Sequence, residues 1–199
     1  PDFNTPAHIC EAAIDAIKNG FTRYTPASGT LELKAAVAKK FEKDNNLSYK
    51  AENIVISNGA KHSLMNALGA ILNPGDEVIV IAPFFGEYRG YVSNFGGKIV
   101  PVPSVPGTFQ LDVEAIEKAI TDKTKAIILN SPNNPSGAVY TEESLRALNA
   151  VLERVEKEKS HTIYVVSDEP YVKIVYDGVK VPAISAIFSN SIVVNSFSK

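Results

Sequence analysis

Three polar runs along the chain could do chemistry, and each of them directly follows an apolar stretch. Lys199 ends the chain after Val-Val-Asn-Ser-Phe-Ser, Asp168 begins Asp-Glu-Pro-Tyr, and Asn134 lies in Asn-Ser-Pro-Asn-Asn-Pro-Ser-Gly. A lysine amine can form an imine with an aldehyde, a carboxylate can keep a ring nitrogen protonated, and an amide can donate to a ring oxygen. Together these are the groups that pyridoxal phosphate chemistry needs.

Apolar runs alternate with helical patterns along most of the chain. Short runs of β-branched and aliphatic residues predict buried strands, and apolar residues repeating every three or four positions predict helices. This alternation indicates an α/β domain with a largely parallel sheet. Six strands are expected near residues 54–56, 78–81, 98–100, 126–129, 163–166 and 192–194, and helices near 9–17, 33–45, 60–71, 113–120 and 142–158.

The predicted sheet also explains where the polar runs should meet. In parallel α/β sheets, ligands bind beyond the carboxyl ends of the strands. The turn Asn58-Gly59, the residues Asn130 and Asp168, and the run 196–199 all lie at such ends. We therefore expect residues that are far apart in the sequence to converge at one edge of the sheet.

The overall composition is that of a globular protein. The chain has 199 residues, 45% of them hydrophobic, which is enough for a sizeable core in one domain. The net charge of −2 gives no indication of a nucleic-acid or anionic-membrane partner, and the single cysteine, Cys10, fits a reducing compartment. No apolar run approaches the roughly 20 residues of a membrane span. The chain starts without a methionine or a secretory signal, so we expect a piece of a longer soluble, cytoplasmic protein.

The same motifs, in this order, resemble those of the fold type I pyridoxal-phosphate aminotransferases, specifically class I and II enzymes of the aspartate aminotransferase kind. The resemblance runs from Pro1 to Lys199. It implies a three-layer α/β/α large domain with a mostly parallel sheet, truncated after the lysine that forms the Schiff base. Residues 1–25 would be an N-terminal segment that belongs partly to the small domain and partly contacts the dimer partner. Residues 26–199 would be the incomplete cofactor-binding large domain, with the C-terminal small domain absent.

The resemblance assigns roles to the polar residues at the strand ends. Lys199 matches the lysine that holds the cofactor as a Schiff base and shuttles a proton. Asp168 matches the aspartate that pairs with the pyridinium nitrogen. Tyr171 and Asn134 match the two donors to the phenolate oxygen of the ring. Taken singly, these residues have ordinary alternatives, namely an exposed lysine, a capping aspartate and a Pro/Asn turn.

Gly59, Ala60 and Lys61 match the turn that binds the cofactor phosphate. Small residues at the start of a helix expose backbone N–H groups beside the positive end of the helix dipole, which suits a dianion. The Lys61 ammonium is expected to add charge there, and Ser196 matches a hydroxyl that donates to the phosphate. Many strand-to-helix turns contain glycine, so the position of this turn after the first apolar run is what favours the interpretation.

Two aromatic residues complete the expected site. Phe85 aligns with the position whose ring stacks on the pyridine ring, the alternative being that it belongs to the core. Tyr24 matches a tyrosine that reaches the cofactor phosphate of the neighbouring subunit, which implies a homodimer with shared active sites. The three histidines show no metal-ligand spacing with acidic residues or Cys10, so no metal site is expected.

The reaction implied by the resemblance is transfer of an amino group between an L-amino acid and a 2-oxo acid, with aspartate and 2-oxoglutarate as the default pair. Alternatives stay open because these residues hold the cofactor without setting the reaction. They are a lyase acting on C–S bonds or at Cβ or Cγ, a cofactor-sensing domain of a transcriptional regulator, and an α/β domain without cofactor. Two arginines of the family, for the phosphate and the substrate carboxylate, are not located in this chain, so the chain by itself is expected to be poorly active.

Overall fold

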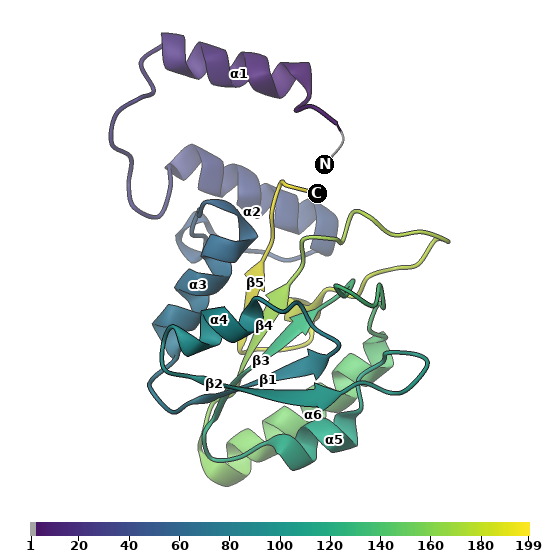
Figure 1. Ribbon diagram of the computed structural model, residues 1–199. Helices are drawn as coiled ribbons and strands as arrows, with labels where there is room; N and C mark the ends of the chain where they lie inside the picture. The colour runs from purple at the N-terminus through teal and green to yellow at the C-terminus, as the bar shows by residue number, and fades with distance from the viewer. Residues whose placement is uncertain (1–2) are drawn as a thin grey trace.

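The computed structural model describes residues 3–199 and is built around one five-stranded sheet (Figure 1). The spatial order of the strands is β2-β1-β3-β4-β5, and neighbouring strands are parallel. Most residues of the three central strands, β1, β3 and β4, are buried, as expected for parallel strands that are covered by helices. The strands are β1 (Glu77–Ala82), β2 (Lys98–Pro103), β3 (Thr124–Asn130), β4 (Tyr164–Asp168) and β5 (Ser191–Val194).

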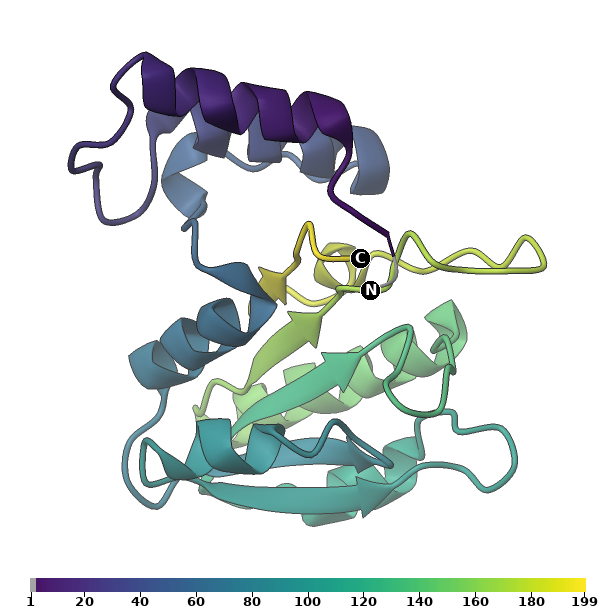
Figure 2. The same ribbon diagram turned by 45° about the horizontal axis from the view of Figure 1, so that its top comes forward.

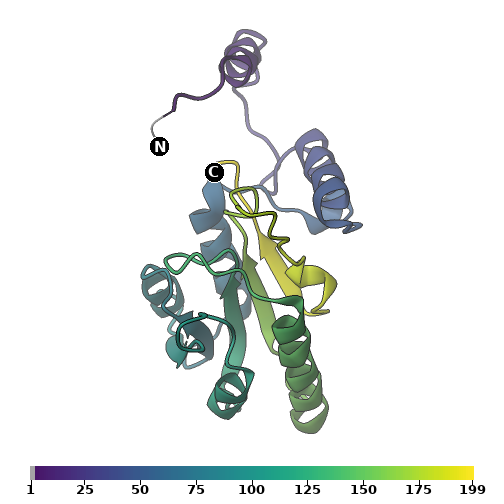
Figure 3. The same ribbon diagram turned by 90° about the vertical axis from the view of Figure 1, so that its right-hand side faces the viewer.

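Helices cover both faces of the sheet, so the expected three-layer α/β/α architecture is confirmed. Side chains of α3 and α4 pack on one face, and side chains of α5 and α6 pack on the other. Figure 3 shows α3 and α6 on opposite sides of the strands. The helices are α1 (Ala7–Lys18), α2 (Leu31–Asn45), α3 (Gly59–Ile71), α4 (Tyr88–Ser93), α5 (Val113–Ala119) and α6 (Glu142–Lys159), with short 3₁₀ helices η1 (Ala51–Asn53) and η2 (Ile184–Ala186).

The strand side chains alternate between two apolar cores. Ile79, Ile127 and Val165 pack with α5 and α6, whereas Val78 and Val166 pack with α3 and α4. Each of these side chains is at most 1% exposed, and full burial of one aliphatic side chain contributes about 1.5–3 kcal/mol. The sheet is therefore held from both sides, and the residues at its edge are attached to a rigid support.

One expected strand, residues 54–56, is not part of the sheet. Ile54 is buried, but Val55 is 62% exposed, and the Ile56 N–H donates to the carbonyl of Ser28 at 3.0 Å. Ser28 lies in the loop before α2, so this segment ties that loop to the start of α3. The prediction of a sixth strand was wrong because an apolar triplet does not distinguish a strand from an extended connection.

The N-terminal helix α1 is separate from the layers of the sheet. It lies above α2 in Figure 2, and none of its residues is buried. Its apolar face, which includes Ile9, Ile14 and Ile17, remains 49–65% exposed. By contrast, α2 is connected to the loop after β4 through the Asp44–Lys173 ion pair, with an O–N distance of 2.9 Å. Within residues 3–199, none of the helices is long and apolar enough to cross a membrane.

Candidate active site

Six of the residues selected from the sequence lie at or after the carboxyl ends of four strands. The strand order changes direction at β1, because β2 lies on one side of it and β3, β4 and β5 lie on the other. At such a switch point, the loops from neighbouring strands diverge and leave room for a ligand. The selected residues follow these ends, with Phe85 after β1, Asn134 after β3, Asp168 and Tyr171 at β4, and Ser196 and Lys199 after β5.

Asp168 is the last residue of β4, and it is only 6% exposed. The Tyr88 hydroxyl donates to Asp168 Oδ2 at 2.5 Å, whereas Oδ1 is buried and has no hydrogen-bond partner in the described part of the chain. Burial raises the pKa of Asp168 to about 6, and the hydrogen bond from Tyr88 opposes this rise because it favours the charged form. A buried carboxylate oxygen without a partner costs free energy, so this position suits a cationic N–H donor.

Asn134 and Tyr171 are brought together next to the end of β4. Asn134 Nδ2 donates to the Tyr171 hydroxyl over 3.4 Å, and both residues are partly exposed. The side chain of Asn130 contacts this loop and Asp168: its Oδ1 accepts from the Asn134 N–H at 2.7 Å, and its Nδ2 donates to the Asp168 carbonyl at 2.8 Å. Two hydrogen-bond donors, on Asn134 and Tyr171, are thus connected to the strand that carries the buried carboxylate.

The turn at Asn58 opens α3, a helix of 13 residues. Gly59 has φ +81°, a left-handed conformation that glycine adopts without strain. Asn58 makes no side-chain capping hydrogen bond, so the side chain at this cap leaves the first N–H groups of the helix available. Those of Ala60 and Lys61 lie at the positive end of the helix dipole, which attracts anions. Figure 1 shows the start of α3 near the carboxyl end of β5.

The side chains of Phe85 and Lys61 lie close together near the start of α4. The Phe85 ring lies edge-on to Tyr88, with centroids 5.6 Å apart and an interplanar angle of 81°. Lys61 Nζ is 5.6 Å from the centroid of Phe85 and 2.6 Å from Glu87 Oε2, which also accepts from the Tyr91 hydroxyl at 2.6 Å. The Lys61 ammonium is therefore paired with Glu87, and it is the backbone of Lys61 that lies at the start of the helix.

Ser196 and Lys199 follow β5, whose last residue is Val194. Ser196 Oγ lies 2.6 Å from Ser198 Oγ and accepts from the Ser198 N–H at 3.1 Å, which forms a tight turn. The Glu169 N–H donates to the Val194 carbonyl at 2.8 Å and ties the ends of β4 and β5 together. Lys199 is exposed, and within residues 3–199 it forms no salt bridge with Asp168.

Tyr24 does not follow a strand of the sheet. It lies in the loop between α1 and α2, and its side chain is fully exposed. Within the single chain, the structure therefore suggests no role for Tyr24. Its predicted contact with a neighbouring subunit stays a prediction.

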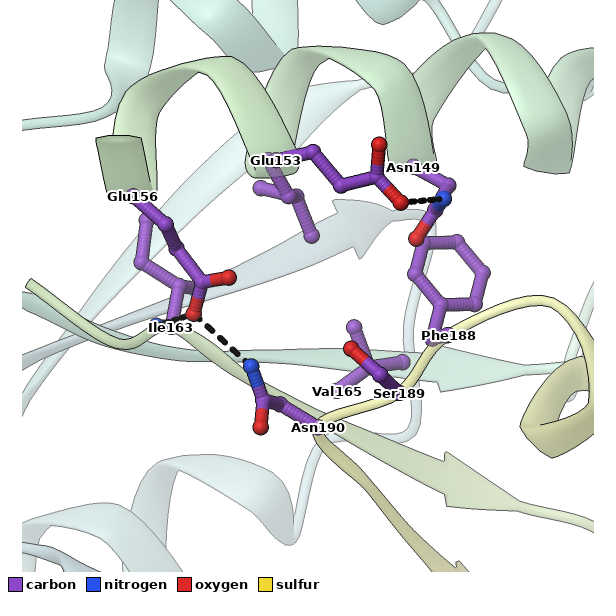
Figure 4. A pocket seen from close by; sticks show the side chains of 9 residues that line it. Asn149, Glu153, Glu156, Ile163, Val165, Phe188, Ser189 and Asn190 are labelled. Carbon is purple, nitrogen blue, oxygen red and sulfur yellow. Dashed lines mark hydrogen bonds between the residues drawn. The ribbon is translucent and has the colours of Figure 1, made fainter. Parts of the chain in front are cut away.

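Two surface hollows lie outside this site. Figure 4 shows one of about 10 Å³ at the amino ends of β4 and β5, where Glu156 Oε1 accepts from Asn190 Nδ2 at 2.9 Å and from the Ile163 N–H at 3.3 Å. The other, about 420 Å³, lies between residues 139–142 and 179–182. In the part of the chain that the structure describes, no group of three His, Cys, Asp or Glu side chains is arranged to hold a metal ion.

Two buried polar residues next to Asp168 were not identified from the sequence. Tyr88, which is 1% exposed, reaches Asp168 across 80 positions, and no local pattern signals such a contact. Glu169, which is 3% exposed, accepts from the Ser167 hydroxyl at 2.6 Å, and burial raises its pKa to about 7. The acidic pair Asp-Glu directly after a buried strand was the available signal for Glu169.

Comparison with known proteins decides the family. The family model described as aminotransferase class I and II matches residues 1–199. The chain belongs to the class I and II aminotransferases. It is 42% identical to an aspartate aminotransferase of Bacillus subtilis, covering all of this chain and 50% of that protein. It is 45% identical to an aspartate/prephenate aminotransferase of Thermus thermophilus, over 89% of this chain and 45% of that protein.

Solved aminotransferase structures have the same fold. An amino transferase from Eubacterium rectale superposes with a TM-score of 0.95 at 36% identity, covering all of this chain and 51% of that one. The aspartate aminotransferase of Thermus thermophilus with maleate gives a TM-score of 0.91 at 41% identity, again covering all of this chain and 51% of that one. The chain thus spans about half the length of these aminotransferases.

Aminotransferases of this family use pyridoxal phosphate, and the residues present fit that group. The buried, unpartnered Oδ1 of Asp168 suits a protonated ring nitrogen. The uncapped start of α3 at Gly59 suits a phosphate. Asn134 and Tyr171 carry the donors that a ring oxygen would accept.

The Tyr88–Asp168 hydrogen bond predicts how cofactor affinity depends on pH. Tyr88→Phe removes this donor, so the pKa of Asp168 should rise above about 6. A hydrogen bond to a charged group contributes ~1.5–3 kcal/mol, equivalent to about 1–2 pH units. Protonated Asp168 does not pair with a cationic ring, so the affinity for pyridoxal phosphate should fall as the pH is lowered. In the full-length Tyr88→Phe protein, this fall should begin at a pH about one unit higher than in wild type. Dissociation constants measured between pH 5 and 9 test this.

Tyr140→Phe is the matched control for this measurement. Tyr140 is also 1% exposed, but its hydroxyl makes no hydrogen bond to Asp168 within the described residues. The dissociation constant of Tyr140→Phe should depend on pH in the same way as that of wild type. Coincident profiles for Tyr88→Phe and Tyr140→Phe would show that Tyr88 does not set the ionisation of Asp168.

Glu169 predicts a pH-dependent stability of the apo-protein. Its pKa is about 7 in the folded chain, against an ordinary value of 4.5. The folded state therefore holds this proton more tightly, and stability should fall as the pH rises from 4.5 through 7. A shift of this size corresponds to about 3 kcal/mol. Urea unfolding at pH 5 and pH 8 should show the loss in wild type and a loss smaller by this amount in Glu169→Gln, which cannot ionise. An equal pH dependence in both proteins would contradict the assignment.

Proposed function

We propose that the protein containing this chain exchanges an amino group between an L-amino acid and a 2-oxo acid, using pyridoxal phosphate bound to Lys199. The observation that carries the proposal is the Asp168 carboxylate, buried at the carboxyl edge of the sheet with one oxygen unpartnered. Aspartate with 2-oxoglutarate is the default substrate pair, since relatives at about 40% identity are named aspartate aminotransferases.

The cofactor, when bound, supplies a protonated ring that accepts the electron pair left on the amino-acid Cα. Asp168 Oδ1 would hold the proton on the ring nitrogen, while Tyr88 keeps Oδ2 hydrogen-bonded and therefore favours the charged carboxylate. Asn134 and Tyr171 would donate to the ring oxygen. Asp168, Asn134 and Tyr171 would together orient the ring.

The phosphate and the ring face are held by residues on other elements. The Ala60 and Lys61 N–H groups at the start of α3 would bind the phosphate, with Gly59 forming the turn that exposes them, and the Ser196 hydroxyl after β5 would add a donor. Phe85 would stack on the ring, and its edge-on contact with Tyr88 fixes the position of its side chain.

Lys199 would hold the cofactor through its Nζ. The same amine would serve as the base that moves the proton away from the amino-acid Cα. Lys199 lies five residues after β5 and is exposed, and within residues 3–199 it is not paired with Asp168, so its amine is free for this role.

We also propose the organisation of the whole protein. Residues 26–199 form the cofactor-binding domain, and residues 1–25 contact parts of the assembly outside this chain, in accord with the exposed apolar face of α1. In a homodimer, Tyr24 would reach the cofactor phosphate of the neighbouring subunit. A single cysteine, Cys10, is compatible with a cytoplasmic protein.

Substitution of Lys199 and Asp168 in the full-length protein tests the reaction. Lys199→Ala should still bind pyridoxal phosphate through Asp168 and the start of α3, yet lose nearly all amino transfer. Asp168→Ala should keep the lysine-bound cofactor but lose a factor on the order of 10³ in kcat, because the charge formed at Cα is no longer dispersed. Amino transfer is measured with a panel of L-amino acids and 2-oxo acids.

Lys98→Ala is the control, since Lys98 is an exposed lysine on β2 and should leave turnover unchanged. Near-normal turnover in Lys199→Ala would overturn the mechanism. Release of ammonia or thiol without an acceptor 2-oxo acid would instead identify a lyase.

A further inference from the structure

We propose that Asn130 is a positioning residue that fixes the ring-nitrogen carboxylate and the ring-oxygen donor in one rigid arrangement. Asn130 is the last residue of β3 and is 4% exposed. It has no place among the groups that would touch the cofactor. The inference rests on the proposed function, because it concerns how the cofactor is held.

Both polar atoms of the Asn130 amide are used, and each contacts a different part of the site. Nδ2 donates to the carbonyl of Asp168 at 2.8 Å, and Oδ1 accepts from the N–H of Asn134 at 2.7 Å. Both distances are those of well-formed hydrogen bonds. Because an amide is planar and rigid, the backbones of Asp168 and Asn134 are held at a fixed separation.

The Asn130 side chain lies at the point where the pairing between β3 and β4 ends. Asn130 is paired in register with Asp168, the last such pair between β3 and β4. The next residues are Ser131 and Pro132, and proline has no N–H with which to continue a strand ladder. Where the chain leaves the sheet, the Asn130 amide donates to the Asp168 carbonyl. Its oxygen accepts from the Asn134 N–H and so holds the loop against the end of β3.

The arrangement continues to Tyr171. Asn134 Nδ2 donates to the Tyr171 hydroxyl, so one hydrogen-bonded series runs from Asp168 through Asn130 and Asn134 to Tyr171. The two ends of this series are the groups assigned to opposite polar atoms of the cofactor ring. Asn130 therefore couples the two contacts, and its loss should disturb both at once.

Binding of pyridoxal phosphate to the full-length protein tests this inference. Asn130→Ala should raise the dissociation constant on the order of 10-fold, since it leaves the buried carbonyl of Asp168 and the partly buried N–H of Asn134 without these partners and so releases both from their positions. It should also raise the pH midpoint of the visible absorbance change of the bound cofactor by about half a unit or more, because the donor to the ring oxygen is displaced. Asn130→Asp has the same shape and keeps the acceptor for Asn134 but loses the donor to Asp168, so it should also weaken binding.

Ser131→Ala is the matched control. Ser131 is 1% exposed, and its hydroxyl accepts from the Tyr140 N–H at 3.0 Å, so this variant also leaves one buried backbone group unpaired in the same loop. It should lower the melting temperature but change the dissociation constant by less than about 2-fold and leave the midpoint in place. A double-mutant cycle adds a second criterion: the effect of Asn130→Ala should shrink in an Asn134→Ala background.

The outcomes separate the inference from the proposed function. If wild-type protein fails to bind pyridoxal phosphate, the proposed function and this inference both fall. If wild type binds it, but Asn130→Ala matches Ser131→Ala in affinity and midpoint, then Asn130 only stabilises the loop and the inference alone is wrong. An Asn130→Ala effect that is undiminished in the Asn134→Ala background would also overturn it.

Discussion

Burial of the Asp168 carboxylate at the end of β4 is the constraint on which the proposed site depends. Removing a carboxylate from water is costly unless the charge is paired, and burial raises the pKa of Asp168 to about 6 although the hydrogen bond from Tyr88 opposes this rise. Tyr88 offsets part of this cost at one oxygen, and the other oxygen has no partner in the described residues. The protein therefore holds a carboxylate that gains from a cationic donor. In the proposed site a protonated pyridine ring would supply such a donor, and cofactor binding would then stabilise the charged form of Asp168.

The sheet explains how the remaining groups come to surround this carboxylate. All five strands run in the same direction, and the strand order reverses at β1, so the loops after β1, β3, β4 and β5 face one region. The central strands β1, β3 and β4 are fixed by apolar packing on both faces, which holds their last residues in place. The polar side chains are then connected across strands, as Asn130 connects Asp168 to Asn134. Rigid strands and these short connections keep the site ordered, although its loops are partly exposed.

Much of this could be predicted from the sequence, because apolar runs and the residues that end them carry local signals. The alternating runs predicted the parallel α/β architecture and the ends of the strands, including Asp168 as the end of β4. The strand at residues 54–56 was predicted wrongly, since Ile56 bonds to Ser28 and not to a strand. Tyr88 could not be predicted as a partner of Asp168, because their contact spans 80 positions and depends on how α4 packs on the sheet. The pairing of Lys61 with Glu87 was missed for the same reason.

The central claim, that Lys199 carries the cofactor, is tested most directly by trapping the bond itself. Borohydride converts the link between a lysine amine and pyridoxal phosphate into a stable secondary amine, and mass spectrometry of a digest then identifies the modified residue. In the full-length holoprotein, the cofactor mass should be found on Lys199. In Asp168→Ala the fraction of Lys199 that is modified should fall only as far as cofactor binding falls. Modification of Lys61, which lies at the start of α3 beside Phe85, or of any other lysine in place of Lys199, would contradict the account.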